Sequence, residues 1–230
     1  MKKIFLFAAA LVAAMTVNAK VINLKGIVDT TSVDNAKASM EAAFEFTNTY
    51  IKGEQDSKGK PYAQVYQKDA STDWETSVIE LKADDQVSFA FKDGNADKLV
   101  LKAYESYFQP NGKAVCLIIS GLKADDKVKL NFKSALNKKA SVDGAKEGAL
   151  IELNADAIEL TASGEEIRLY SKDNEANAEA KWQIISVELP GGDQAIDNVE
   201  VTEKAVKTFE NGQLVIIKNG VRYNALGAKL

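Results

Sequence analysis

Residues 118–132 read IISGLKADDKVKLNF, and the last eleven of them closely repeat residues 81–91, LKADDQVSFAF. In both copies an Ala-Asp-Asp turn leads into a segment whose apolar residues occupy alternate positions. These residues are Val87, Phe89 and Phe91 in the first copy and Val128, Leu130 and Phe132 in the second. A period of two is that of a β-strand with one buried face. The repeat therefore predicts two core strands, which we interpret as scaffold rather than chemistry.

The rest of the chain continues this pattern of short apolar segments separated by turns rich in Gly, Asn and Asp. About ten strands and few helices favour an all-β fold, an antiparallel β-sandwich or jelly roll, with a β-barrel as the alternative. The apolar run 114–120 is predicted to be a central strand. Residues 121–126 are short enough to join it to the next strand as an antiparallel neighbour. Residues 30–45, with Ser32 as a candidate N-cap, fit a short helix and an irregular turn about equally.

The first nineteen of the 230 residues have the pattern of a secretory signal peptide. Two lysines precede the apolar run 4–15, and Val17-Asn18-Ala19 resembles a signal-peptidase site. Twelve apolar residues are too few to span a bilayer comfortably, and no second hydrophobic run follows. We therefore expect no membrane span in the mature chain. The expected location is outside the cell or at its surface, with the periplasm as the alternative.

The remaining chain divides into three parts by composition. We expect residues 20–189 to form the β-sandwich domain. Residues 190–207 begin with Pro-Gly-Gly-Asp and continue as a polar, charged run, which is typical of a linker. Residues 208–230 carry Asn-Gly pairs at 211 and 219 on either side of an apolar segment, a pattern that predicts a C-terminal β-hairpin.

Composition excludes several classes of function. The chain contains no histidine, which removes Ser-His-Asp and Cys-His catalysis and every imidazole-ligated metal site. Its one cysteine, Cys116, lies in an apolar run, so we expect a buried thiol and no intramolecular disulfide. The net charge is −4, and it becomes −6 when Lys2 and Lys3 leave with the signal peptide. We therefore expect no nucleic-acid partner.

The C-terminal residues resemble a known export signal. The run IDNVEV at 196–201 is followed by NGQLVIIKNGVRYNALG at 211–227. These segments are similar to the type IX secretion sorting domains of exported Bacteroidetes proteins, in which an Asn-Gly strand pair leads to a Y-N-x-x-G run. Tyr223, Asn224 and Gly227 stand in those places. The preceding domain resembles, more loosely, the galactose-binding-like sandwiches that accompany such tails, and the resemblance implies export.

Aromatic residues are the candidate ligand-binding groups, because the apolar face of a sugar ring stacks on a flat aromatic ring. Tyr104, Tyr107 and Phe108 are the first choice, since 105–113 reads as an exposed turn containing Pro-Asn-Gly. Trp74 follows. Tyr62 and Tyr66 come next, because alternation around them predicts a strand with aromatics on one face. For each of these residues, ordinary core packing is the alternative.

Acidic residues offer one candidate metal site. Asp93, Asn95 and Asp97 place oxygen side chains at alternate positions, as a structural Ca²⁺ loop requires. The same residues suit a plain hairpin turn, which we favour, so no cofactor is expected beyond this candidate Ca²⁺. The Asp-Asp pairs at 84–85 and 125–126 are likewise interpreted as turn formers.

The leading hypothesis is an exported, non-catalytic module that binds a glycan or another cell-surface component. A structural or adhesive surface protein is the second hypothesis. A carbohydrate-active enzyme is the third, because Glu75 and Glu80 are available carboxylates but no spacing singles out a catalytic pair. We therefore expect that the protein is not an enzyme; its oligomeric state is left open.

Overall fold

A computed structural model describes residues 19–134, 139–153, 156–173 and 177–191, together with the backbone of three strands between 206 and 224. The chain divides into two compact units, Met1–Gly191 and Gly192–Leu230. The expected signal peptide, apart from Ala19, lies outside the described residues, as does 192–205 of the expected linker. Within the described part of the chain, no helix has the length and apolar character needed to cross a bilayer.

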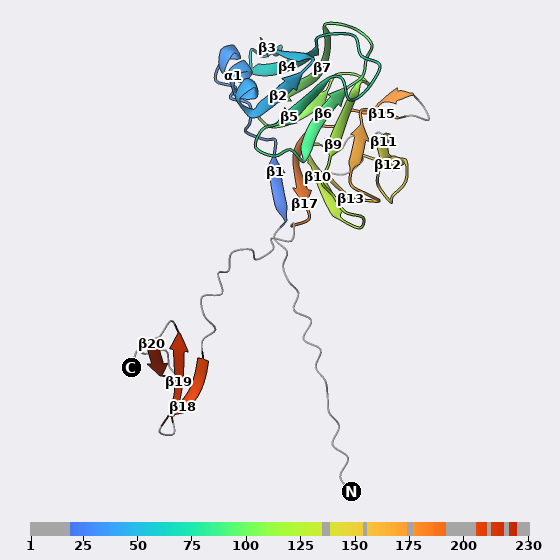
Figure 1. The fold of residues 1–230 in the computed structure, drawn as a ribbon. Helices are drawn as coiled ribbons and strands as arrows, with labels where there is room; N and C mark the ends of the chain where they lie inside the picture. The colour runs from blue at the N-terminus through green and yellow to red at the C-terminus, as the bar shows by residue number, and fades with distance from the viewer. Residues whose placement is uncertain are drawn as a thin grey trace. The chain divides into compact units, whose positions relative to one another are not determined.

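Two open antiparallel sheets make up the first unit (Figure 1). Sheet A contains, in spatial order, β13 (Ala157–Thr161), β10 (Lys127–Phe132), β17 (Ile184–Leu189), β8 (Tyr107–Pro110), β7 (Lys98–Tyr104), β4 (Pro61–Gln67) and β3 (Thr49–Gln55), and β1 (Lys20–Asn23) also pairs with β17. Sheet B contains β12 (Leu150–Glu152), β11 (Lys139–Asp143), β14 (Ile167–Tyr170), β9 (Val115–Ile119), β6 (Val87–Phe91), β5 (Val78–Leu81) and β2 (Phe44–Thr47). A separate pair is formed by β15 (Lys172–Asp173) and β16 (Ala178–Glu179). The predicted antiparallel β-sandwich is confirmed, and the alternative of a closed barrel is wrong because both sheets are open.

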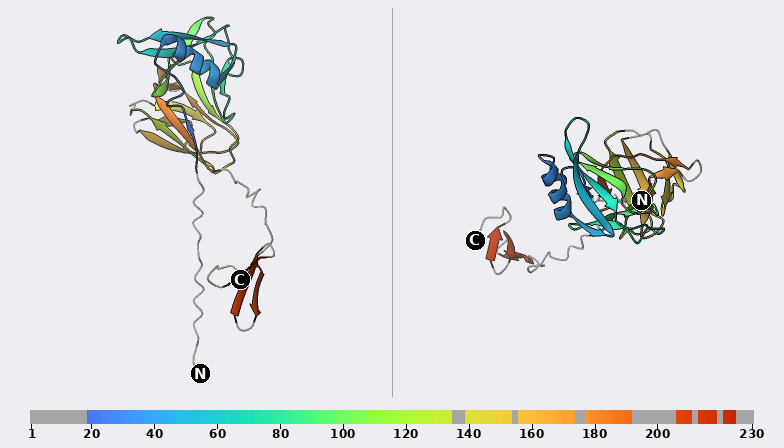
Figure 2. Two further views of the ribbon diagram at one scale, coloured as in Figure 1. Left: turned by 90° about the vertical axis from the view of Figure 1, so that its left-hand side faces the viewer. Right: turned by 90° about the horizontal axis from the view of Figure 1, so that it is seen from above.

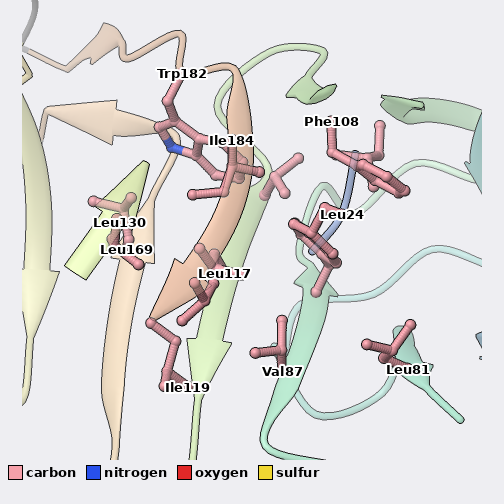
Figure 3. Packing of buried hydrophobic residues seen from close by; sticks show 14 of the residues in the cluster. Leu24, Leu81, Val87, Phe108, Leu117, Ile119, Leu130, Leu169, Trp182 and Ile184 are labelled. Atoms are coloured by element: carbon pink, nitrogen blue, oxygen red, sulfur yellow. The ribbon is translucent and has the colours of Figure 1, made fainter. Parts of the chain in front are cut away.

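The core lies between the two sheets and contains both copies of the repeated segment. The first copy forms β6 of sheet B and the second forms β10 of sheet A. Their alternate apolar residues are buried, as predicted, with none more than 4% exposed. Figure 3 shows Leu130 of β10 and Leu169 of β14 close together, with Leu117 of β9 nearby. Each copy therefore contributes one strand, on opposite sides of the same core.

The connection after β9 differs from the expectation. β9 pairs with β6 and β14 in sheet B, whereas β10 pairs with β13 and β17 in sheet A. Residues 121–126 therefore cross from one sheet to the other, and the predicted hairpin between neighbours is wrong. Within the crossing Leu122 is buried, and Asp126 Oδ2 accepts a hydrogen bond from Lys123 N at 2.8 Å. In the first copy Asp84 Oδ1 accepts from Gln86 N at 3.1 Å, so both acidic pairs contain a residue that shapes a turn.

The helix-like window forms α1 (Val33–Ala43). The Ser32 side chain accepts a hydrogen bond from Asn35 N at 3.0 Å, which caps the helix as the sequence suggested. Ala36 and Met40 are fully buried in the core cluster, and α1 contacts β3 and β4 (Figures 1 and 2). Gly53 of β3 permits this contact, because a Cβ at this position would lie 2.2 Å from the backbone oxygen of Val33.

The second unit contains three antiparallel strands, β18 (Val206–Glu210), β19 (Gln213–Lys218) and β20 (Val221–Asn224). The sequence predicted a two-stranded hairpin from residue 208, so β18 was missed as a strand and begins within the expected linker. Tyr223 and Asn224 of the sorting-like run lie in β20. Gly227 and the two Asn-Gly pairs lie outside the described residues.

Candidate functional site

Five of the seven tyrosines lie on the outer face of sheet A, the face turned away from the core. The pleat of β4 explains the arrangement. Ala63 and Val65 are fully buried in the core, so Tyr62, Gln64 and Tyr66 point to the opposite face. The sequence predicted this alternation. The other members are Tyr50 of β3, Tyr104 of β7 and Tyr107 of β8, of which Tyr50 pairs with Tyr66 and Tyr104 pairs with Tyr107.

The first row of the face consists of Tyr62, Tyr104 and Tyr107 on three adjacent strands. The ring centroids of Tyr62 and Tyr104 are 4.8 Å apart with an interplanar angle of 14°, and those of Tyr104 and Tyr107 are 4.8 Å apart at 32°. The first pair is stacked and the second is tilted, and both separations are about the spacing of neighbouring strands. The row therefore presents mainly ring edges and hydroxyl groups. At the end of the row, Lys133 Nζ lies 4.3 Å from the Tyr107 ring centroid.

A second row is formed by Tyr50 and Tyr66, whose centroids are 5.2 Å apart at 11°. Lys52 Nζ lies 4.8 Å from the Tyr66 centroid. Gln64, which is buried, connects the two rows: Tyr66 Oη donates to Gln64 Oε1 at 2.5 Å, and Gln64 Nε2 donates to Tyr62 Oη. Hydrogen bonding of this kind fixes the orientation of the phenol groups.

A hollow of about 310 Å³ lies beside the first row. Its lining comprises Thr30, Asp56, Lys58, Lys60, Pro61, Tyr104, Glu105, Ser106, Tyr107 and Lys133. The turn between β3 and β4 supplies one side, where Asp56 Oδ1 accepts from Lys58 N at 2.8 Å and Lys60 N at 2.9 Å. The short connection between β7 and β8 supplies another. These segments are distant in sequence, and the register of sheet A places them together.

Burial shifts the titration of the phenols at the hollow. Burial is the main reason why the pKa of Tyr104 rises to about 12, and electrostatic interactions with Tyr107 and Tyr62 raise it further. Burial also raises the pKa of Tyr107, and the Asp56 carboxylate adds to the effect. The backbone hydrogen bond from Lys60 is the main cause that lowers the pKa of Asp56. At neutral pH the hollow therefore contains neutral phenols, which can both donate and accept hydrogen bonds, beside an ionised carboxylate.

Of the six candidate ligand-binding residues, two line the hollow. Tyr104 and Tyr107 line the hollow, but Phe108 is fully buried and stacks on Phe89 with centroids 5.8 Å apart. Figure 3 shows Phe108 among the core residues. The interpretation of 105–113 as an exposed turn is wrong for residues 107–110, which form β8. Adjacent residues of a strand face opposite sides of the sheet, so Tyr107 points outward and Phe108 points into the core. Phe108 is therefore structural.

Trp74 lies beside the outer face of the other sheet. Its ring packs on Tyr170 of β14 with centroids 5.3 Å apart at 59°. It covers a small buried cluster formed by Ala90, Cys116 and Tyr170. Trp74 is therefore separate from the tyrosine rows and has a packing partner of its own. Cys116 is fully buried, and burial raises the pKa of its thiol.

The candidate calcium loop joins β6 to β7. Asp93 forms an ion pair with Lys98 at 3.7 Å and accepts from Asn95 Nδ2. Asp97 Oδ1 instead accepts from Tyr50 Oη at 2.8 Å. The two carboxylates therefore have separate protein partners, which favours the alternative of a turn. Among the described residues, no three or more His, Cys, Asp or Glu side chains are grouped so that they could hold a metal ion.

The sequence did not single out Lys133, Asp56, Lys58 or Lys60 as site residues. The Lys-Gly-Lys-Pro turn indicated only a hairpin, and nothing local connects Lys133 with Tyr107. The pairing of β8 with β17, together with the hydrogen bond from Lys133 N to Gln183 O, places them side by side.

Comparison of the chain with protein-family models, with curated proteins and with solved structures returned no match. The function is therefore inferred from the site itself.

Proposed function

We propose that the protein is an exported, non-catalytic glycan-binding module and that the hollow beside Tyr104 and Tyr107 is its sugar site. The signal-like residues 1–19 and the sorting-like tail support export. The observation that carries the proposal is the hollow of about 310 Å³, which tyrosine, acidic and lysine residues line beside an aromatic row.

A sugar needs this combination of groups. Its hydroxyls require closely spaced donors and acceptors, and its C–H face requires a small apolar surface. Tyr107 ends the aromatic row with Lys133 Nζ over its ring, and Tyr104 and Tyr107 both line the hollow. Asp56 is held in place by two backbone hydrogen bonds and is available as a fixed acceptor. Small-ligand sites of this kind combine apolar walls with a few oriented polar groups.

Binding is favoured over hydrolysis by the state of the Asp56 carboxylate. A glycosidase needs an acid with a raised pKa opposite a second carboxylate. At the hollow, the hydrogen bonds that shape the β3–β4 turn lower the pKa of Asp56. Glu105 Oε2 accepts from Thr30 Oγ1 at 3.4 Å. Asp56 is thus tuned as a hydrogen-bond acceptor rather than as a general acid.

Affinity gel electrophoresis against a panel of soluble polysaccharides tests the proposal. At least one polysaccharide should retard the protein, and Tyr107→Ala should weaken its binding about tenfold or more, because the ring at the end of the row is lost. Tyr50→Ala is the matched control: it removes a half-buried tyrosine from the same face but outside the hollow, and it should bind like the wild type. Thermal unfolding of both variants establishes that they are folded. The proposal is wrong if no polysaccharide retards the wild type, or if Tyr107→Ala binds unchanged.

The second unit supports an additional role in attachment at the cell surface. Its described residues form three short strands, and a sheet of this size needs a packed apolar face for stability. Deletion of residues 192–230 should change the fraction of the cell in which the protein is found while leaving glycan binding intact. Unchanged fractionation would argue against this role.

A further inference from the structure

We infer, on the basis of the function proposed above, that the sugar bound in the hollow is acidic and carries a carboxylate or a sulfate group. Three lysines are among the residues that line the hollow: Lys58, Lys60 and Lys133. Within the described parts of the chain, none of the three forms an ion pair at 4.0 Å or less. The chain as a whole has a net charge of −4, so this local excess of cations does not reflect its composition.

The two carboxylates at the hollow do not neutralise these lysines by direct contact. Asp56 Oδ1 is used by the backbone N–H groups of Lys58 and Lys60. The ammonium groups of the same two lysines act on Asp56 only through space and lower its pKa slightly further. Glu105 Oε2 accepts from Thr30. The lining therefore holds three cationic groups without a direct ionic partner, and an anionic ligand group would supply one.

Lys133 is placed to pair with that group while the sugar contacts the aromatic row. Its Nζ lies 4.3 Å from the Tyr107 centroid and 3.4 Å from Ser106 Oγ. A sugar that contacts Tyr107 from within the hollow would therefore have this ammonium group beside it. The side chain of Lys133 is exposed and can move to meet the ligand. Lysine acts as a compact point charge, so it accepts either a carboxylate or a sulfate.

Two lysines farther along sheet A are not free to bind an extended polyanion. Lys127 and Lys129, farther along sheet A, are already paired with Glu159 at 2.6 Å and with Glu188 at 3.2 Å. Nucleic acid binding requires a continuous track of free cations along the backbone. The unpaired lysines at the hollow are instead gathered around one small volume, as recognition of a single acidic sugar residue requires.

Matched polysaccharides that differ only in charge test the inference. The full chain should bind polygalacturonate about tenfold or more tightly than its fully methyl-esterified form, and dextran sulfate should be compared with dextran in the same way. Binding to one charged member of the two pairs identifies the anionic group as carboxylate or sulfate. Lys133→Gln and Lys60→Gln should each weaken binding to that polysaccharide about fivefold or more. Lys52→Gln is the control, because Lys52 lies on the same face over Tyr66 but does not line the hollow.

The results separate this inference from the proposal on which it rests. If the neutral member of each pair binds as tightly as the charged one, the site binds glycans but the inferred acidic ligand is wrong. If no polysaccharide binds, both the inference and the proposed function are wrong. If a single-stranded oligonucleotide binds as tightly as the polysaccharides and Lys52→Gln weakens binding as much as Lys133→Gln, the face is a non-specific anion-binding surface and the inference is also overturned.

Discussion

Replacement of Gly53 by alanine tests how α1 is held against sheet A. The new Cβ would lie 2.2 Å from Val33 O, 2.7 Å from Val33 Cγ1 and 2.9 Å from Val33 C. Two of these atoms belong to the backbone, so a side-chain rotation cannot relieve the clash. The first residue of α1 and β3 must separate until the Cβ–O distance reaches ordinary contact, at 3.4 Å or more. Overpacking of this kind costs about 1–3 kcal/mol.

For a domain of this size, a loss of about 2 kcal/mol lowers the midpoint of thermal unfolding by roughly 4–8 °C. Thermal and urea unfolding followed by circular dichroism would measure the change. Gly164→Ala is the control, because a Cβ at Gly164 has no neighbour within 4 Å. A midpoint for Gly53→Ala within 1 °C of this control, a limit set well below the roughly 4 °C expected, would show that α1 does not pack on β3 as described.

Three further predictions follow from residues on or near the two sheets. Phe108→Ala should lower the free energy of unfolding by about 3–5 kcal/mol, whereas Tyr107→Ala should cost much less; equal losses in urea unfolding would contradict the assignment of adjacent residues to opposite faces. Burial raises the pKa of Tyr104 from its ordinary value of 10.0 to about 12, so folding favours the neutral phenol. The resulting stability is complete below pH 10 and is lost as the pH rises towards 12. Urea unfolding at pH 8 and pH 11 should therefore show a smaller loss for Tyr104→Phe than for the wild type, and identical losses would refute this. Finally, the buried Cys116 thiol should react with a thiol reagent only after unfolding; rapid labelling of the folded protein would show that β9 is not central.

The sequence contained enough information for the sandwich, because strand periodicity is local. The alternation of apolar residues around Val87, Phe89 and Leu130 predicts buried strand faces from only a few residues of sequence. All three side chains are fully buried in the structure. Sheet membership is not local. Nothing in residues 121–126 distinguishes a hairpin from a crossing between sheets, since both need a short turn, and the deciding factor is which partner strands lie on each side.

The candidate site was predictable only in part for the same reason. Tyr104 and Tyr107 could be named from their aromatic character, and the alternation around Tyr62 indicated which face they share. Phe108 was included because 105–113 was interpreted as a turn, in which adjacent residues need not face opposite sides. Lys133 could not have been named, because the pairing of strands distant in sequence brings it to Tyr107.

The central claim, that the hollow beside Tyr104 and Tyr107 binds a sugar, is tested most directly by mapping a ligand onto the protein. Trigalacturonate added to ¹⁵N-labelled protein should shift the backbone amide resonances of residues 56, 58, 60, 104–107 and 133, which line the hollow. The resonances around Trp74 and Tyr170, on the other sheet, should not move. Shifts confined to the Trp74 surface, or no shifts at any ligand concentration while the matched polysaccharides also fail to bind, would contradict the account.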